Sequence, residues 1–347
     1  MKKILFVALG ATLLAAGCQK TEIINPVGDK IGFSSEMGKL TKAETAGDLT
    51  TLKSQNFKVW AYTAYEDDLN GVERGQLYDG INGLEIKFDQ NASTENQWVT
   101  ADGKDYYWPG KEFDLDFYGV STTKTVTVDI VSDGAEELGD RVLTVKGYVA
   151  NPNVATDDLM VANFVRQNQT DKDDKSVSMR FNHALSKVTF AFKTAGDKQV
   201  SVSKIEVLGL TTSGNLEVTE APKDYDDATM TSVKLEWKDS DGEFGNKMGD
   251  YVREFTGDDA ILGKSDHVPF TTWLVIPQEL TNKTVKIYYS IGEKNFTHVF
   301  SLESSSLENG WEVNQSITYN VTLSPNTISF VPSVQPWEEK APVTEVN

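Results

Sequence analysis

Short runs of alternating apolar and polar residues recur along this chain, and they constrain its fold more than any other feature. In FDLDFYGVS (113–121), Phe113, Leu115 and Phe117 share one side of the predicted strand. Such alternation is typical of strands with one buried face. Helix-period patterns are almost absent after residue 18, and Gly, Asn, Asp and Pro clusters separate the runs, so the sequence predicts an all-β protein of sandwiches or barrels. The other runs are FKVWAYTAY (57–65), TVTVDIV (125–131), RVLTVKGYV (141–149), KVTFAFKT (187–194), VSKIEVLGL (202–210), TVKIYYSIG (284–292) and SITYNVTLS (316–324).

A polar stretch, RQNQTDKDDKS (166–176), interrupts this pattern near the middle of the chain. Polar, β-poor stretches are typical of domain boundaries or exposed loops. We therefore expect an N-terminal domain at 43–168 and a C-terminal domain at 176–347. The length of 347 residues agrees with two domains, and the lack of a fixed-period repeat argues against solenoids and propellers.

The first 18 residues have the parts of a bacterial export signal. Lys2 and Lys3 precede an apolar run, ILFVALGATLL, and small residues then lead to Cys18, the only cysteine of the chain. The apolar run is too short for a permanent membrane-spanning helix. The small residues before Cys18 resemble the lipobox of bacterial lipoproteins. We expect a signal peptide at 1–17 and acylation of Cys18 as a membrane anchor; the alternative is an unmodified cysteine discarded with the signal.

The net charge of −19 limits the classes of partner. Nucleic-acid binding needs clustered Lys and Arg for phosphate contacts, so no nucleic-acid partner is expected. The acidic residues are spread along the chain, which is typical of a solvated surface. With its single thiol acylated, the mature chain can form no disulfide and depends on its hydrophobic cores.

No motif for catalysis, metal binding or cofactor binding stands out. The three histidines lie more than 30 residues apart, and His183 lies on the apolar side of a predicted strand, which favours a hydrogen-bonded structural role. The Asp-rich turns DDLNG (67–71) and DSDGE (239–243) lack the calcium-loop pattern. A nucleophile elbow, a P-loop and a dinucleotide fingerprint are also missing. We therefore expect no enzymatic activity, no cofactor and no metal.

A cluster of aromatic residues leaves a second function open. Trp98, Tyr106, Tyr107 and Trp108 would stack on sugar rings if they were exposed. The commoner role of such a run is a strand edge and turn that close a core. Exposed rings would indicate a surface glycan-binding lipoprotein that does not polymerise.

Seven stretches, in order and over nearly the whole chain after the signal, resemble the fimbrillin family of Bacteroidia, the lipoprotein pilins and pilin-like proteins of type V pili. The resemblance implies two tandem β-sandwich domains with transthyretin-like topology. It also implies export to the outer membrane, removal of an N-terminal strand by a maturation protease that is typically arginine-specific, and addition of a strand from another pilin subunit. The stretches are IGFSSEMGKLTKAE (31–44), YYWPGKEFDLDFYGVS (106–121), DLMVANF (158–164), VSMRFNHALSKVTFAFK (177–193), IEVLGLTTSGNL (205–216), LVIPQEL (274–280), and WEVNQSITYNVTL with ISFVPSVQPWEE (311–339).

The N-terminal residues fit this assembly by themselves. Ile31, Phe33 and Met37 share one parity, with Ser35 between them, so 30–37 is predicted to be a one-sided strand. Loss of a strand exposes backbone groups and an apolar slot. A strand from another copy satisfies both by β-augmentation, and such a head-to-tail contact makes filaments.

The polar segment GKLTKAETAGDL after this strand is a predicted site of proteolysis. LTKAE aligns with the family's threonine-arginine-alanine pattern, so we predict cleavage between Lys42 and Ala43, with Lys39 as the other lysine nearby. Cleavage would remove the lipidated segment 18–42. If lysine is not accepted, the chain stays lipidated as a pilus anchor, an accessory subunit or a separate surface lipoprotein.

The C-terminal run NTISFVPSVQPWEEK has two interpretations. Ile328, Phe330 and Val334 alternate on one face, as a strand donated to a groove would. Pro332 and Pro336 lack N–H donors, which favours an edge strand. The alternative is that this run completes the sheet of its own domain. The sequence as a whole favours a structural or adhesive pilus subunit at the outer membrane.

Overall fold

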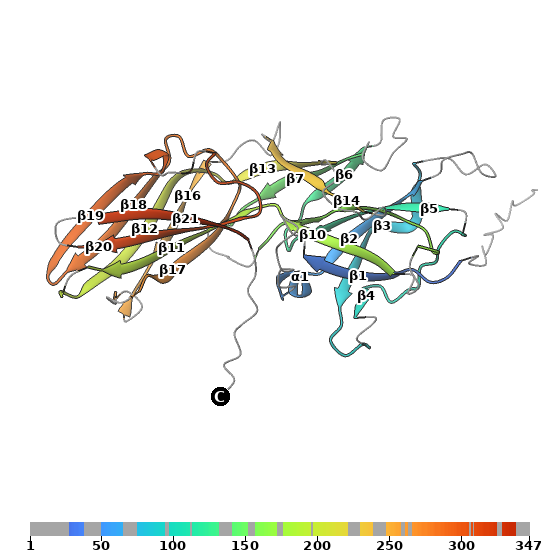
Figure 1. Cartoon of the computed structure of the whole chain (residues 1–347), viewed down its shortest axis with the longest axis horizontal. Helices are drawn as coiled ribbons and strands as arrows, with labels where there is room; N and C mark the ends of the chain where they lie inside the picture. Colours follow the sequence, from blue (N-terminus) through green and yellow to red (C-terminus); the bar gives the residue numbers. More distant parts are fainter. Residues whose placement is uncertain are drawn as a thin grey trace, which may run out of the picture.

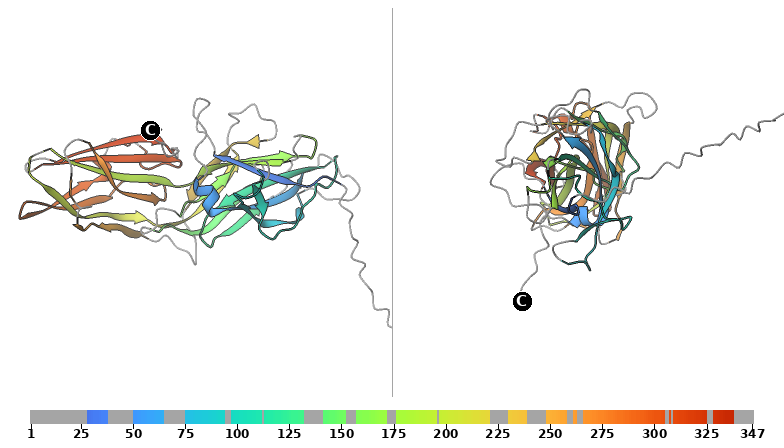
Figure 2. Two further views of the ribbon diagram at one scale, coloured as in Figure 1. Left: turned by 90° about the horizontal axis from the view of Figure 1, so that it is seen from below. Right: turned by 90° about the vertical axis from the view of Figure 1, so that its right-hand side faces the viewer.

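The computed structural model describes residues 28–37, 50–64, 75–93, 97–111, 113–131, 141–151, 157–171, 176–195, 197–220, 230–238, 248–257, 261–262, 266–304, 307, 309–324 and 328–337. Within these ranges the only α-helix, α1 (Thr50–Gln55), has six residues, and strands make up nearly all the remaining regular structure. The prediction of an all-β protein is confirmed. Figures 1 and 2 show two bodies of strands that follow each other along the long axis of the molecule.

The first body is built around a nine-stranded sheet with the order β14-β9-β5-β2-β3-β4-β1-β10-β8. An additional pairing of β5 with β8 closes the strands between them into a ring. One cluster of buried apolar side chains fills this ring, including Phe33, Phe57, Phe117 and Phe181. The strands are β1 (Gly32–Met37), β2 (Phe57–Ala64), β3 (Leu77–Phe88), β4 (Trp98–Thr100), β5 (Asp114–Ser121), β8 (Met160–Ala162), β9 (Phe164–Gln167), β10 (Ser176–His183) and β14 (Met230–Thr231).

A four-stranded sheet, β15-β13-β7-β6, covers part of the outer side of the ring. Phe117 of β5 belongs to the cluster inside the ring, whereas the next residue, Tyr118, belongs to a second cluster with Leu143 and Leu216 of the covering sheet. Because successive side chains point to opposite faces of a strand, β5 is buried on both faces. The covering strands are β6 (Thr127–Val131), β7 (Val142–Val149), β13 (Ser213–Glu220) and β15 (Val233–Lys238).

The second body is a β-sandwich of two four-stranded sheets, β17-β11-β20-β21 and β16-β12-β18-β19. Phe190 and Tyr319 of the first sheet and Ile205 and Ile287 of the second are fully buried in one core cluster. Period-two alternation in the sequence is therefore matched by a core between two sheets. The strands are β11 (Ser186–Thr194), β12 (Val200–Thr211), β16 (Met248–Glu254), β17 (Val268–Val275), β18 (Thr284–Ile291), β19 (Lys294–Ser301), β20 (Gln315–Leu323) and β21 (Ile328–Pro336).

The sheets do not follow the expected division into residues 43–168 and 176–347. β10, which starts at Ser176, pairs with β1 and β8 of the first body. β13, later still in the chain, pairs with β7 in the covering sheet. The polar residues 166–176 therefore join two strands, β9 and β10, of one sheet. Polar composition marks an exposed loop, but it does not say which sheets the flanking strands join.

Candidate strand-exchange site

β1 occupies a place between β10 and β4 in the ring. It runs parallel to β10 over six residue pairs, from Gly32↔Ser176 to Met37↔Phe181. With β4 it shares one pair, Phe33↔Trp98. β1 is therefore held by backbone pairing mainly along its β10 side.

The residues just before β1 pair with the aromatic segment before β5. The backbone N–H of Ile31 donates to the carbonyl oxygen of Tyr106 (2.8 Å), and that of Trp108 donates to the oxygen of Asp29 (2.9 Å). The N–H of Asp29 donates in turn to Oε1 of Gln169 (3.0 Å). These bonds fix the direction in which the chain enters the ring.

Inward side chains of β1 and of the residue just before it complete the core of the ring. Ile31 is 3% exposed and Phe33 is 5% exposed. The Phe33 ring meets Phe117 edge-on, with centroids 6.3 Å apart. The predicted one-sided pattern is confirmed for these two residues, while the side chain of Met37 lies outside the described residues. Burial of each large apolar side chain stabilises the seated strand by about 1.5–3 kcal/mol.

Ser35 is a weak point of β1. Its hydroxyl oxygen is buried and has no hydrogen-bond partner among the described residues. A buried polar group without a partner costs about 1–3 kcal/mol. The unpaired Ser35 hydroxyl therefore lowers the stability of β1 in the ring.

The wall of the ring away from β1 carries a buried ion network. The Asp116 carboxylate accepts hydrogen bonds from Nη1 of Arg141 (2.7 Å) and from Nε and Nη2 of Arg166 (2.7 and 3.0 Å). Nη1 of Arg141 also donates to the hydroxyl of Tyr118 (3.3 Å), and burial raises the pKa of Tyr118 above its usual range. These contacts join β5 to β9 and to the start of β7 independently of β1.

β21 lies at the edge of the second body. It pairs antiparallel with β20 over nine residue pairs, from Gln315↔Pro336 to Leu323↔Ile328. The described side chains of β21 lie largely outside the core, with Val331 55% and Val334 43% exposed. In this state the C-terminal run completes the sheet of its own body, which is the second interpretation from the sequence.

Trp337 anchors the end of β21 at the junction of the two bodies. It is 6% exposed and stacks on the ring of His183, with centroids 3.8 Å apart and planes 2° apart. Its backbone N–H donates to the carbonyl oxygen of Asn314 (3.0 Å). Its indole N–H is buried without a partner among the described residues. Nδ1 of His183 lies 2.5 Å from Oδ2 of Asp158, which confirms a hydrogen-bonded structural histidine.

The proposed sugar-stacking rings do not form an exposed platform. Trp98 and Trp108 are 9% and 1% exposed and belong to the core of the ring. Trp108 packs edge-on against Phe117, with centroids 5.7 Å apart. Tyr106 and Tyr107 are half-buried, and the hydroxyl of Tyr106 donates to Asp102 (2.9 Å). Burial of both tryptophans favours the commoner role, in which the run closes a core, over the alternative of sugar stacking.

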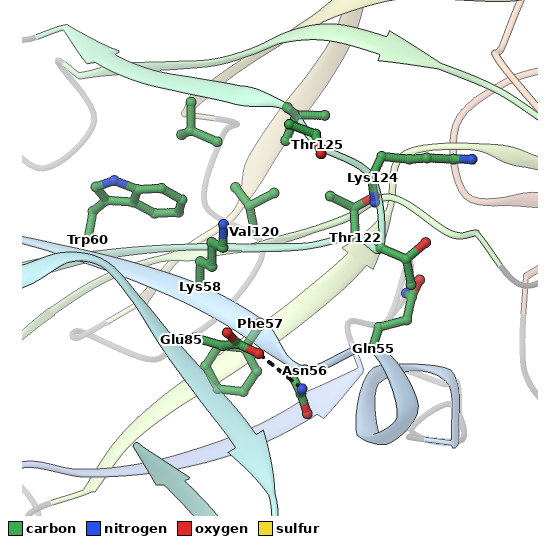
Figure 3. A pocket seen from close by; sticks show the side chains of 13 residues that line it. Gln55, Asn56, Phe57, Lys58, Trp60, Glu85, Val120, Thr122, Lys124 and Thr125 are labelled. Atoms are coloured by element: carbon green, nitrogen blue, oxygen red, sulfur yellow. Dashed lines mark hydrogen bonds between the residues drawn. The ribbon is translucent and has the colours of Figure 1, made fainter. Parts of the chain in front are cut away.

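A pocket of about 310 Å³ lies beside the start of β2 (Figure 3). Trp60 and Val120 line it together with polar side chains, and Nδ2 of Asn56 donates there to Oε1 of Glu85 (3.2 Å). Lys124 also lines the pocket and forms an ion pair with Asp157 (2.5 Å). Partial burial raises the pKa of Asp157, but hydrogen bonds from Lys124 and Thr123 outweigh this and hold that pKa below its usual value. Such a mixture of aromatic, aliphatic and hydrogen-bonding groups suits a small polar ligand.

Several predicted sites lie outside the described residues. These are Cys18, Lys42 and Ala43; the Asp-rich turns at 67–71 and 239–243, which are not predicted sites, also lie outside the described residues. Within the described ranges, no group of three or more His, Cys, Asp or Glu residues is placed to hold a metal ion. No helix in the same part of the chain is long and apolar enough to cross a membrane.

The fold and the two terminal strands define a class: all-β proteins with two successive bodies, a first strand seated in the ring and a last strand on an open edge. The chain matches the model of the fimbrillin-like family over residues 41–337. It therefore belongs to the fimbrillin-like family.

Two solved structures are similar in fold. A fimbrial protein from Bacteroides vulgatus is 15% identical, with a TM-score of 0.58, over 89% of this chain and 99% of that chain. A proposed cell adhesion protein from Bacteroides uniformis is 16% identical, with a TM-score of 0.50, over 89% and 98%. No curated protein matches the chain.

Proposed function

We propose that this chain is a structural or adhesive subunit of a cell-surface pilus, exported as an outer-membrane lipoprotein through Cys18 and assembled by strand addition. Membership of the fimbrillin-like family and the fold shared with a fimbrial protein support a pilus subunit. The partners are the outer membrane, a maturation protease that cuts between Lys42 and Ala43, and other pilin subunits.

The observation that carries the proposal is the place of β1. Cleavage after Lys42 separates β1 from the rest of the chain, because β1 ends at Met37. Its departure exposes the backbone edge of β10 along six residues and uncovers the buried apolar side chains Val177, Met179 and Phe181. An open edge beside an apolar slot is a template for an incoming strand.

β21 is the best donor among the described strands. It lies at an edge, most of its described side chains are exposed, and it comes near the end of the chain. Donation to the ring of a second copy leaves that copy's own β21 free for a third. This head-to-tail contact does not close on itself and produces a filament.

Substitution of the predicted cleavage site tests the processing step. In a host that exports and processes the full chain, Lys42→Ala should accumulate the lipidated precursor and lose SDS-resistant polymers from the surface fraction. Lys39→Ala, three residues away, is the matched control and should leave both unchanged. Normal polymer yield from Lys42→Ala would refute cleavage at this site.

A glycan-binding lipoprotein remains the alternative function, now at the pocket lined by Trp60. The pocket's size and mixed lining favour a small polar ligand such as a sugar. This alternative predicts that sugars change tryptophan fluorescence, and that Lys58→Ala and Glu85→Ala abolish the change. A lack of any sugar response in the full chain would remove it.

A further inference from the structure

β1 and β21 carry the same apolar pattern at the same spacing. β1 and the residue before it read IGFSSEM (31–37), and β21 begins ISFVPSV (328–334). Isoleucine stands first and phenylalanine third in both segments, and an apolar residue, Met37 or Val334, stands seventh. The two segments therefore carry apolar residues in the same order along the chain.

We propose that β21 of a second copy replaces β1 in this register, parallel to β10, with Ile328 in the place of Ile31 and Phe330 in that of Phe33. Val334 then takes the place of Met37. This inference rests on the proposed function and adds the residue-by-residue identity of the exchanged strand.

The second position of the pattern accepts the change from glycine to serine. A Cβ atom added at Gly32 would lie 3.5 Å from Cβ of Ser176, which is an ordinary van der Waals contact. The φ of Gly32 is not positive, so the backbone there does not require glycine. Ser329 therefore fits beside Ser176 without displacing β10.

The fifth position favours the incoming strand. Ser35 buries a hydroxyl that has no hydrogen-bond partner among the described residues, whereas Pro332 at the corresponding position has no hydroxyl. Proline also lacks an N–H donor, which suits a strand edge without a partner. On the β4 side, β1 is paired only at Phe33, so the backbone near position 35 has no described neighbour there. The exchange removes an unpaired buried group, and proline at the fifth position costs no described pairing with β4.

The match has a defined upstream limit. A Cβ atom at Gly28 would lie 2.3 Å from the carbonyl oxygen of Trp108, too close for any side chain. In the proposed register Pro325 corresponds to Gly28. The incoming chain must therefore diverge from the path of the original strand before Ile328, and the exchanged segment starts at about that residue.

Two described valines of β21 give up little burial when the strand leaves its own sheet. Val331 and Val334 are 55% and 43% exposed there. The anchor at Trp337 is imperfect, because its buried indole N–H has no partner among the described residues. Release costs the pairing with β20, and pairing with β10 of the next copy restores backbone bonds.

Cysteine pairs test the register directly. Cys18 is the only natural cysteine and is lipidated or removed in the proposed pathway, so an introduced pair stands alone. Filaments would be assembled from full-length chains carrying Ser176→Cys with Ser329→Cys, or Ser178→Cys with Val331→Cys, and oxidised. Adjacent strands lie about 4.8 Å apart, within the roughly 4.4–6.8 Å between Cα atoms that a disulfide needs. The matched control, Ser178→Cys with Ser329→Cys, is displaced by two residues, about 6.6 Å along the strand.

The first two pairs should give a ladder of disulfide-linked subunits on a denaturing gel, and the control pair should not. The ladders should vanish when Lys42→Ala retains β1. Filaments without a ladder from the first two pairs, or with one from the control, would overturn the register and leave the pilus function standing. If the unsubstituted chain forms no filaments, the pilus function fails, and the inference fails with it.

A second variant tests the fifth position without cysteine chemistry. Pro332→Ser restores to the donor the hydroxyl that β1 carries at Ser35. Filaments of this variant should dissociate in SDS about tenfold faster than the original, whereas Ser333→Ala should have no effect. Equal dissociation of the Pro332→Ser and original filaments would contradict the placement of Pro332 in the ring.

Discussion

β1 and β21, the first and last strands that the structure describes, are held in opposite ways. β1 and the residue before it bury Phe33 and Ile31 in the ring, but β1 pairs along its length only with β10. β21 pairs with β20 along its whole length but leaves most of its described side chains in solvent. β1 therefore has buried side chains but little pairing on its β4 side, whereas β21 has continuous pairing with β20 but few buried side chains among those described. This difference explains how removal of β1 can open a site in the ring where an incoming β21 buries more of its side chains.

The largest expected effect is at Phe33. Phe33→Ala in the unprocessed chain removes a ring that packs on Phe117 inside the core, and should lower the free energy of unfolding by about 3–5 kcal/mol. The matched change on the other strand, Val331→Ala, alters an exposed side chain and should stay within about 0.5 kcal/mol. Chemical denaturation of both variants measures the contrast. Similar losses of unfolding free energy in the two variants would contradict the burial of Phe33 and the exposure of Val331.

Trp337 is the exception on β21, because it is the one buried residue among the described side chains from Ser329 to Trp337. Trp337→Ala should weaken the strand's attachment by about 2 kcal/mol, below the usual loss for a core tryptophan because its indole N–H is unpaired. Hydrogen exchange of the β21 amides should then accelerate about 30-fold while β10 stays protected. Val334→Ala is the control on the same strand. Equal exchange in the two variants would show that Trp337 does not hold β21.

Ser35→Ala should have a smaller effect of opposite sign. It removes the buried hydroxyl without a described partner and should raise the stability of the unprocessed chain by about 1 kcal/mol. Thermal unfolding, with Ser34→Ala as the neighbouring control, measures the gain. A loss of stability would mean that the hydroxyl has a partner after all.

The smallest effect is expected at Val334. Val334→Thr in the folded monomer changes a half-exposed side chain and should alter the unfolding free energy by less than about 0.5 kcal/mol. In filaments the same change should weaken the subunit contact, because the proposed register places residue 334 where Met37 stood. Filament dissociation and monomer unfolding, measured side by side, separate the two states. A large monomer effect would contradict the exposure of β21.

The sequence predicts the strand class and the one-sided pattern of β1, because alternation is a local property. It does not predict that β10 joins β1, which lies more than 140 residues earlier in the chain. It also leaves open whether Trp98 and Trp108 are exposed, since their burial depends on β1 and other distant strands. The stack of Trp337 on His183 likewise joins two bodies and has no local signal. The repeated I-x-F pattern of the two terminal segments is visible in the sequence, but it has meaning only once both segments are known to be strands.

The N-terminus of subunits in assembled filaments tests the exchange most directly. Filaments purified from the cell surface should contain subunits that begin at Ala43, and mass spectrometry should detect no peptide from residues 30–37. Subunits that retain those residues, with an acylated Cys18 as their only N-terminus, would show that β1 stays in its ring and that the filament is built in another way.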